Sequence, residues 1–208
     1  MLFSGFSNED FDLFKIEGLE PRMEELIRRV RPKLDFLGNH FTPSLTALTG
    51  QEMFAHIAKH ARRTVNPPND TWVAFANNKR GYKMRPHFQI GLWESHLFIW
   101  FAVIYECPEK LEIGNKLKSN IDRIFENTPE NFYWSIDHTK PEALSHQQLS
   151  KKDLSVIFKR LQEVKKAEIL CGYQIPREQA VEMSSEELLN KIDWVFNNLI
   201  QLYDLSYK

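Results

Sequence analysis

The stretch from Pro86 to Tyr105 constrains the fold more than any other part of this chain, because it reads as two apolar strands joined by a tight turn. In Pro86–Trp93, large apolar residues alternate with polar residues or glycine, which is the period-two pattern of a strand with one face in a core. The segment His96–Tyr105 is apolar at nearly every position, as in a strand covered on both faces. This hairpin, residues 86–105, is therefore expected at the centre of a sheet.

A turn at Glu94 and Ser95 would also set the register of the hairpin. It predicts that three large apolar residues of the first strand lie opposite three of the second. The predicted pairs are Leu92 with Leu97, Ile90 with Ile99 and Phe88 with Phe101. All six side chains would then lie on one face of the hairpin, where they can enter a core.

Three further segments have the composition of strands, namely Thr71–Ala76, Phe132–His138 and Glu168–Ile175, the last of them expected to be short and at an edge. Amphipathic helices are expected around them. Because a hairpin cannot belong to a purely parallel sheet, the sequence predicts an α+β fold with a mostly antiparallel sheet of about five strands. No linker rich in Gly, Ser or Pro divides the 208 residues, so we expect a single domain over 1–208.

Capping residues mark several helix starts. Ser150 with Asp153 and Ser184 with Glu187 each open an apolar stripe at helical spacing. By the same pattern, Thr49 with Glu52 predicts a helix over about residues 50–63. Pro32 interrupts an earlier helical pattern and predicts either a kink or two short helices there.

Positive charge is concentrated in one part of a chain whose net charge is only −1. Between residues 55 and 90 there are seven Lys or Arg residues and one acid, Asp70, so the other 172 residues carry −7. A wholly basic nucleic-acid binder is therefore excluded, and any anionic partner must be recognised locally. The basic residues of this segment are Lys59, Arg62, Arg63, Lys79, Arg80, Lys83 and Arg85.

If these side chains meet in space, residues 56–87 form an anion-binding site for a phosphorylated small molecule or for nucleic acid. Tyr82 adds a ring that can stack on a base, and His87 begins the adjacent strand. The candidate anion-binding residues are Arg62, Arg63, Lys79, Arg80, Tyr82, Lys83, Arg85 and His87. The structural alternative is a helix end and a hairpin tip whose cations are simply hydrated.

Histidines supply the candidates for acid–base or metal chemistry. On the predicted helix, His56 and His60 are four residues apart, the spacing at which two imidazoles can share a metal ion, and His87 is a third candidate. The surroundings are cationic, which disfavours a dication, so no metal is expected and buried or helix-surface histidines are the favoured interpretation. Asp137 with His138, and nearby His146, form only a weak acid–base pattern, for which a hydrated loop is the alternative.

The sequence contains no motif for a common catalytic or nucleotide-binding site, and no signal for secretion or membrane insertion. No nucleophile elbow, phosphate-binding loop or dinucleotide fingerprint is present, so no cofactor is expected. Cys107 and Cys171 stand in unrelated contexts and suggest neither a disulfide nor a zinc site, as is usual in a reducing cytosol. The start MLFSGFSNED lacks the features of a signal peptide, and no apolar run reaches the roughly 18 residues of a membrane span. A cytoplasmic protein without a membrane partner is the expectation.

Four segments together resemble the YktB-type family of Bacillus and related bacteria. They read GLEPRMEELI at 18–27, HIAKHARRTVNPPNDTWVAFANNKRGYK at 56–83, PHFQIGLW at 86–93 and HLFIWFAVIYE at 96–106. The resemblance extends over nearly the whole chain and implies a single α+β domain of unknown function. It implies no catalytic, metal-binding or ligand-binding residues.

Three functions remain as hypotheses. The first is a module that binds an anionic ligand through residues 56–87. The second is an enzyme that uses His56, His60 or His87 as an acid, a base or a metal ligand. The third is a protein-interaction domain without catalysis, suggested by the 42% of hydrophobic residues.

Overall fold

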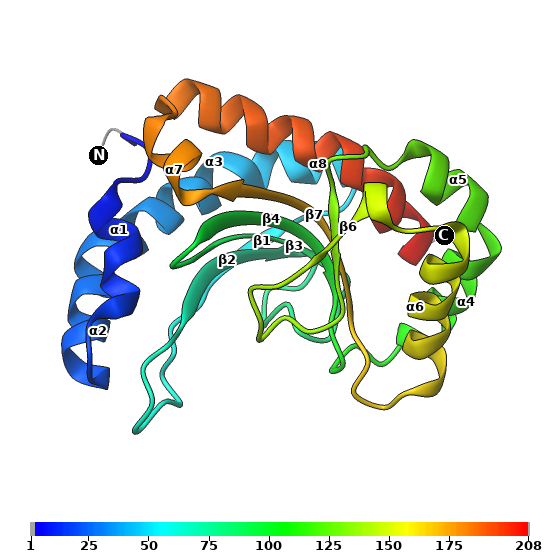
Figure 1. The fold of residues 1–208 in the computed structure, drawn as a ribbon, viewed down its shortest axis with the longest axis horizontal. Coiled ribbons are helices and arrows are strands. Elements are labelled where there is room, and N and C mark those ends of the chain that lie inside the picture. The colour runs from blue at the N-terminus through cyan, green and yellow to red at the C-terminus, as the bar shows by residue number, and fades with distance from the viewer. Residues whose placement is uncertain (1–2, 208) are drawn as a thin grey trace.

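A computed structural model describes residues 3–207, which fold around one curved antiparallel sheet (Figure 1). The sheet has seven strands in the order β1-β2-β3-β4-β7-β5-β6, and all neighbouring pairs are antiparallel. The strands are β1 (Phe54–Ile57), β2 (Asp70–Ala76), β3 (His87–Trp93), β4 (His96–Val103), β5 (Tyr133–Ser135), β6 (Leu144–Ser145) and β7 (Ile169–Pro176). Mixed helix and antiparallel sheet were predicted, but the expected number of about five strands was too low.

The central hairpin has the predicted register. Leu92 lies opposite Leu97, Ile90 opposite Ile99, and Phe88 opposite Phe101. Every residue of β3 and β4 is buried, which was predicted for both faces of β4 but for only one face of β3. The strand predicted at Glu168–Ile175 exists as β7, but it is eight residues long and lies inside the sheet between β4 and β5 rather than at an edge.

The helix predicted over residues 50–63 is wrong. Helix α3 (Arg31–Thr49) continues through Pro43 to Thr49 and ends at Gly50, which has a left-handed φ of 69°. The hydroxyl of Thr49 donates to the Leu45 carbonyl at 2.7 Å and thus serves the end of a helix, not the start of one. Residues 54–57 then pair with β2 as the edge strand β1, because strand pairing satisfies the backbone there.

The two strands missing from the prediction, β1 and β6, have four and two residues. Neither is long enough to carry a clear period-two pattern. The break expected near Pro32 is present, since α2 (Leu19–Glu25) passes through a π-helical turn, η2 (Leu26–Val30), before α3 begins. The remaining helical segments are α1 (Asn8–Asp12), η1 (Leu13–Lys15), α4 (Lys110–Ser119), α5 (Ile121–Asn127), η3 (His146–Gln148), α6 (Lys151–Glu163), α7 (Arg177–Glu182) and α8 (Ser185–Tyr207).

The helices leave one face of the sheet uncovered. Helices α3 and α8 lie over the convex face, and α4, α5 and α6 gather beside it, while the concave face carries only loops (Figure 1). The convex face belongs to a large apolar core that includes Phe75, Phe88 and Phe101, which pack with Phe196 of α8 or with one another. The concave face has a separate, smaller cluster, in which Trp93, Phe98 and Trp100 are buried. No helix among residues 3–207 is long and apolar enough to cross a membrane.

Candidate ligand-binding site

A hollow of about 330 Å³ opens on the concave face of the sheet, and its floor is aromatic. The floor consists of Trp72 from β2, Trp93 from β3, and Phe98 and Trp100 from β4. These side chains alternate with those that enter the helix-covered core, so each strand contributes to both faces. Three loops supply the walls: the β1–β2 connection with His60 and Arg62, the β2–β3 connection with Tyr82, and the β5–β6 connection with His138 and Lys140.

Two glycines create the room for these rings. A Cβ added at Gly91 would lie 2.3 Å from Cζ of Phe98 and 2.6 Å from Cβ of Trp72. A Cβ added at Gly172 would lie 1.9 Å from the Ile99 carbonyl oxygen and 3.0 Å from Cε3 of Trp100. Real Cβ atoms do not tolerate such distances, so only glycine lets the aromatic side chains lie close against the sheet.

Polar groups are fixed among the rings. Indole Nε1 of Trp72 donates to the hydroxyl of Tyr82 at 3.1 Å, which holds the basic β2–β3 loop against the concave face. The amide of Gln89 donates to Nε2 of His87 at 2.8 Å, and the amide of Gln174 donates to Nε2 of His96 at 3.0 Å. Both glutamines also line the hollow. Because Nε2 of each histidine accepts a hydrogen bond from a glutamine amide, each neutral imidazole carries its proton on Nδ1.

Asp70, at the start of β2, is a buried carboxylate in this hollow. It is only 9% exposed and lies across from Trp93. No Lys, Arg or His between residues 3 and 207 forms an ion pair with it. Burial raises its pKa to about 6, and the nearby charges of His138 and Arg63 only partly oppose that rise. A buried carboxylate with no cationic partner disfavours the folded state once it is ionised.

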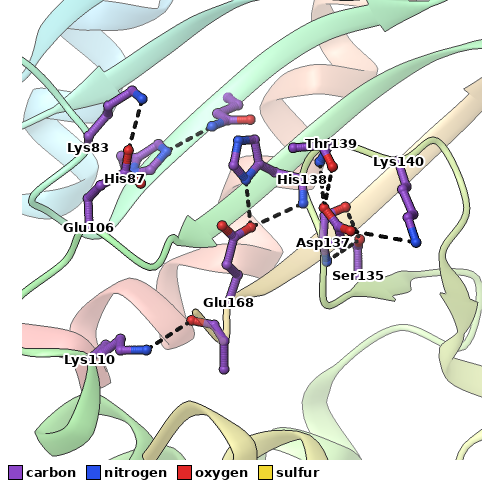
Figure 2. A network of polar contacts seen from close by, with 12 residues as sticks. Lys83, His87, Glu106, Lys110, Ser135, Asp137, His138, Thr139, Lys140 and Glu168 are labelled. Atoms are coloured by element: carbon purple, nitrogen blue, oxygen red, sulfur yellow. Dashed lines mark hydrogen bonds and ion pairs between the residues drawn. The ribbon is translucent and has the colours of Figure 1, made fainter. Parts of the chain in front are cut away.

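His138 lines the same hollow and is held by a buried glutamate, Glu168 (Figure 2). Oε2 of Glu168 accepts from Nδ1 of His138 at 2.6 Å and from the backbone N–H of His138 at 3.1 Å. Burial by itself would lower the pKa of His138, but the hydrogen bond and the charge of Glu168, with the charges of Asp70 and Glu106, raise it above its ordinary value. Of the imidazoles in the described chain, this one alone contacts a carboxylate.

Sequence reasoning associated His138 with Asp137, whereas the structure pairs it with Glu168. The carboxylate of Asp137 instead accepts from the backbone and hydroxyl of Thr139, at 3.0 and 2.6 Å, and closes a local turn. His146 is also used locally, since Trp134 Nε1 donates to its Nδ1 at 3.1 Å and its Nε2 donates to the Phe125 carbonyl. Figure 2 shows Asp137 turned toward Ser135, Thr139 and Lys140, away from the His138 ring.

The predicted basic residues only partly come together. Arg62 and Lys83 line the hollow, while Lys79 and Arg80 border a separate depression at the tip of the β2–β3 loop. Arg63 turns outward and donates to the carbonyls of Asn66 and Pro67, each at 3.2 Å.

Two of the predicted cations are already paired with acids. Lys83 forms an ion pair with Glu106 at 2.9 Å, and Arg85 forms one with Glu109 at 3.1 Å. The cations that line the hollow are Lys59, Arg62, Lys83 and Lys140.

His56, His60 and His87 do not form a common site. His56 lies on β1 and not on a helix, and its Nε2 donates to the Asn78 carbonyl at 2.8 Å. His87 is fully buried, with Nδ1 donating to the Arg85 carbonyl at 2.7 Å, and burial lowers its pKa to about 4. His60 has a positive φ of 52° and lies edge-on to Trp72, and burial lowers its pKa to about 4 as well. Residues 3–207 contain no group of three His, Cys, Asp or Glu side chains placed to hold a metal ion.

Glu168, Asp70 and the aromatic floor were not among the predicted site residues. The tryptophans were visible in the sequence, but as core residues, because an apolar strand gives no sign that one of its faces lacks a covering helix. Glu168 is separated from His138 by helix α6, so no local spacing connects them. Asp70 is the one member of this set that the sequence could have indicated, because it is the single acid in the basic segment 55–90 and the first residue of an apolar strand.

The chain is similar to a family of proteins and to several individual proteins. The model of a family described as "Domain of unknown function (DUF1054)" matches residues 6–203. A UPF0637 protein of Bacillus velezensis is 56% identical over 203 residues, covering 98% of this chain and 97% of the relative. A UPF0637 protein of Bacillus cytotoxicus is 49% identical, with 99% of each chain covered. Among solved structures, a conserved hypothetical protein from Pyrococcus furiosus matches with a TM-score of 0.45 and 13% identity, covering 89% of this chain and 99% of that one.

Proposed function

The chain belongs to the DUF1054 family, whose function is unknown, and we propose that its concave hollow binds a small, planar organic anion. One observation carries the proposal: the helix-free face of the sheet combines, in a single cavity, an aromatic floor with a rim of four cations, of which Lys59 and Arg62 form no ion pair among the described residues. The proposal keeps the anionic ligand expected from the sequence but moves its centre from the basic loop to the sheet.

The size and lining of the cavity favour a small molecule. Ligand sites typically have volumes of about 300–1,000 Å³ and combine apolar walls with a few polar groups. Here Trp72, Trp93 and Trp100 offer faces on which a ring can pack, and Gln89 and Gln174 offer amide groups for orientation. Aromatic pairs contribute about 0.5–1.5 kcal/mol beyond the area that they bury, so a flat ligand is favoured over an aliphatic one.

The charges of the rim favour an anion. Lys59 and Arg62 form no ion pair with any carboxylate between residues 3 and 207, and both are exposed beside the hollow. On the opposite wall, Nζ of Lys140 lies 3.8 Å from the carboxylate of Asp137, which makes this the longest of the described ion pairs. An Arg that lacks a partner can bind a carboxylate or a phosphate through two parallel hydrogen bonds.

A nucleic-acid ligand is less well supported. Binding to a nucleic-acid backbone needs several cations along a track. In this segment Lys83 and Arg85 are paired with acids, and Arg63 is bonded to carbonyls of its own loop. The cations that remain surround one cavity and the tip of one loop.

Isothermal titration calorimetry tests the proposal with phenyl phosphate, phenylpyruvate and indole-3-acetate as probes, and with benzyl alcohol as a neutral comparison. We expect the anions to bind more tightly than the alcohol, with an affinity that falls as salt is added. Arg62→Ala should weaken binding roughly tenfold, because a hydrogen bond to a charged group contributes about 1.5–3 kcal/mol.

Arg123→Ala is the matched control, since Arg123 is exposed on α5, does not line the hollow, and its loss changes the net charge equally. It should bind the probes as the wild type does. Equal losses in the two variants would mean that only net charge matters. Failure of every aromatic anion to bind, with tight binding of a single-stranded oligonucleotide, would replace the proposed ligand by nucleic acid.

A further inference from the structure

We infer that the hollow is an active site for proton transfer, in which Asp70 removes a proton from a carbon next to a carbonyl group of the bound aromatic anion and His138 donates a proton to the carbonyl oxygen. The inference rests on the proposed binding function, because the substrate is a member of the same ligand class. The reaction is keto–enol isomerisation, with Asp70 as the base, His138 as the acid and Glu168 as the residue that positions His138.

Asp70 has the environment of a catalytic base. The residue is only 9% exposed, it lines the hollow, and its carboxylate has no ion-pair partner in the described chain. Structural carboxylates at such depth are normally neutralised by a cation or by several donors. A carboxylate kept without them disfavours the folded state, and such groups concentrate at functional sites.

His138 has the environment of a catalytic acid. Glu168, with a side chain only 5% exposed, accepts from Nδ1 and from the backbone N–H of His138, which fixes both the position and the tautomer of the ring. Nε2 is then the ring nitrogen left to meet a bound molecule. His87 and His96 differ, because both ring nitrogens of each are in hydrogen bonds to protein groups. His60 also lines the hollow, but burial lowers its pKa to about 4, so its ring is neutral at neutral pH.

The charged groups around Asp70 and His138 favour a different protonation state for each of the two side chains. The groups that act on Asp70 are His138 and Arg63, and those that act on His138 are Glu168, Asp70 and Glu106. Asp70, with a pKa of about 6, is ionised at neutral pH, while the pKa of His138 is raised above its ordinary value and favours the imidazolium. A base and an acid are therefore present together in a window above pH 6.

The chemistry balances without a further reactant. The C–H bond next to the carbonyl breaks, its proton moves to the carboxylate of Asp70, and its electron pair forms the C=C bond of the enol. The C=O π electrons move to oxygen, which takes the proton from Nε2 of His138. Exchange with water then ionises Asp70 and protonates His138 again. The enol of an aryl-substituted keto acid is conjugated and flat, so it suits the aromatic floor better than the keto form does.

A covalent alternative has less support in the hollow. Ser135 is the hydroxyl residue that lines the hollow beside His138, but its Oγ donates to the Asp137 carbonyl at 3.2 Å and accepts from the Asp137 N–H at 3.3 Å. Its hydroxyl closes a turn and is not directed at the imidazole. Cys107 and Cys171 are both buried outside the hollow, and burial raises the pKa of the Cys107 thiol to about 12.

The test uses the full chain with phenylpyruvate in D₂O, and proton NMR follows loss of the C3 methylene signal. We expect exchange about 100-fold or more above the buffer rate, which is the usual contribution of acid–base catalysis. Asp70→Asn and His138→Asn should each lose most of this acceleration while still binding phenylpyruvate in calorimetry. Asp35→Asn, an exposed residue of α3 with the same change of charge, should exchange at the wild-type rate.

The pH profile separates a role in catalysis from a merely structural one. Wild-type exchange should rise as Asp70 ionises through about pH 6 and fall at higher pH as His138 loses its proton. Glu168→Gln removes the charge that holds the imidazolium, so the descending limb should move to lower pH. A variant that merely loosens the fold would lower the whole profile without moving that limb. Thermal unfolding of each variant checks that it folds, and His138→Asn, at a half-buried site, remains informative if Asp70→Asn is unstable.

The outcomes distinguish the two proposals. Binding of phenylpyruvate without exchange above the buffer rate overturns the proton-transfer inference and leaves the binding function standing. Wild-type exchange in both Asp70→Asn and His138→Asn also overturns it. If phenylpyruvate and the other aromatic anions do not bind at all, both the binding function and the reaction fall.

Discussion

The two faces of the central hairpin differ in what they bury, although the same two strands build both. On the helix-covered face, Phe88, Ile90 and Ile99 are fully buried among apolar side chains. On the opposite face, the neighbouring positions bury polar groups, including Gln89 and His87. The first face buries only apolar side chains of the hairpin, whereas the second buries hydrogen-bonded polar groups beside its aromatic rings. Helix coverage therefore separates the face that forms the main core from the face that carries the proposed ligand site.

This difference follows from the energetics of burial. An apolar side chain gains about 1.5–3 kcal/mol when it leaves water, whereas a buried polar group gains little even when it is hydrogen-bonded. A face that serves only as a core has no reason to contain Asp70 or His138. Substitutions on the two faces should consequently act in different ways.

The largest effect is expected on the helix-covered face. Phe88→Ala removes a ring that contacts Phe101, Phe196 and Tyr203, with centroid distances of 6.0, 5.3 and 5.2 Å. We expect a loss of about 3–5 kcal/mol in the free energy of unfolding, measured by urea denaturation. A loss below about 1 kcal/mol would contradict the assignment of this face as the main core.

Gly172→Ala tests whether the aromatic floor depends on the missing side chain. The new Cβ would meet the Ile99 carbonyl and the Trp100 ring, so the β4–β7 pair must shift. We expect a loss of roughly 1–3 kcal/mol in the free energy of unfolding, together with weaker binding of aromatic anions. Gly81→Ala is the control, because nothing lies within 4 Å of a Cβ added there and φ is not positive. If both variants are equally stable, the close approach at Gly172 is not needed.

Asp70→Asn should have the opposite sign and raise stability at neutral pH. Because folding raises the pKa of Asp70 from 3.8 to about 6, the folded state binds the proton more tightly, and stability falls as pH rises from about 4 to 6. Above that window the ionised carboxylate destabilises the fold by on the order of 3 kcal/mol. Urea denaturation at pH 8 should show a gain of this size in Asp70→Asn, shrinking toward zero near pH 4. Asp35→Asn should show no such pH-dependent difference, and a destabilised Asp70→Asn at pH 8 would contradict the prediction.

The smallest effect is expected for the predicted cations that are paired at the surface. Arg85 and Glu109 form an ion pair in which the side chains are 42% and 43% exposed. Arg85→Ala should change the free energy of unfolding by no more than about 0.5 kcal/mol and leave the binding of aromatic anions unchanged. Calorimetry in which Arg85→Ala loses as much affinity as Arg62→Ala would place the site at the basic loop instead of the hollow.

Much of the fold could be predicted because its signals are local. The hairpin register followed from a short turn and an alternating pattern, and the caps at Ser150 and Ser184 followed from a hydroxyl three residues before an acid. The failure at residues 50–63 was local too, since Thr49 and Glu52 imitate a capping box that Gly50 prevents by ending the preceding helix. A short edge strand such as β1 gains its stability from its partner and not from its own composition.

The candidate site was harder to predict because it depends on distance in space. The sequence by itself determined that an apolar hairpin lies at the centre of an antiparallel sheet and that positive charge gathers in residues 55–90. Only the tertiary structure decided which face the helices cover, and it brought together Asp70, His138 and Glu168 from three separate segments. Periodicity reports that a side chain is buried, but contact between distant segments depends on how the whole chain packs. For that reason the core was readable from the sequence, and the site was not.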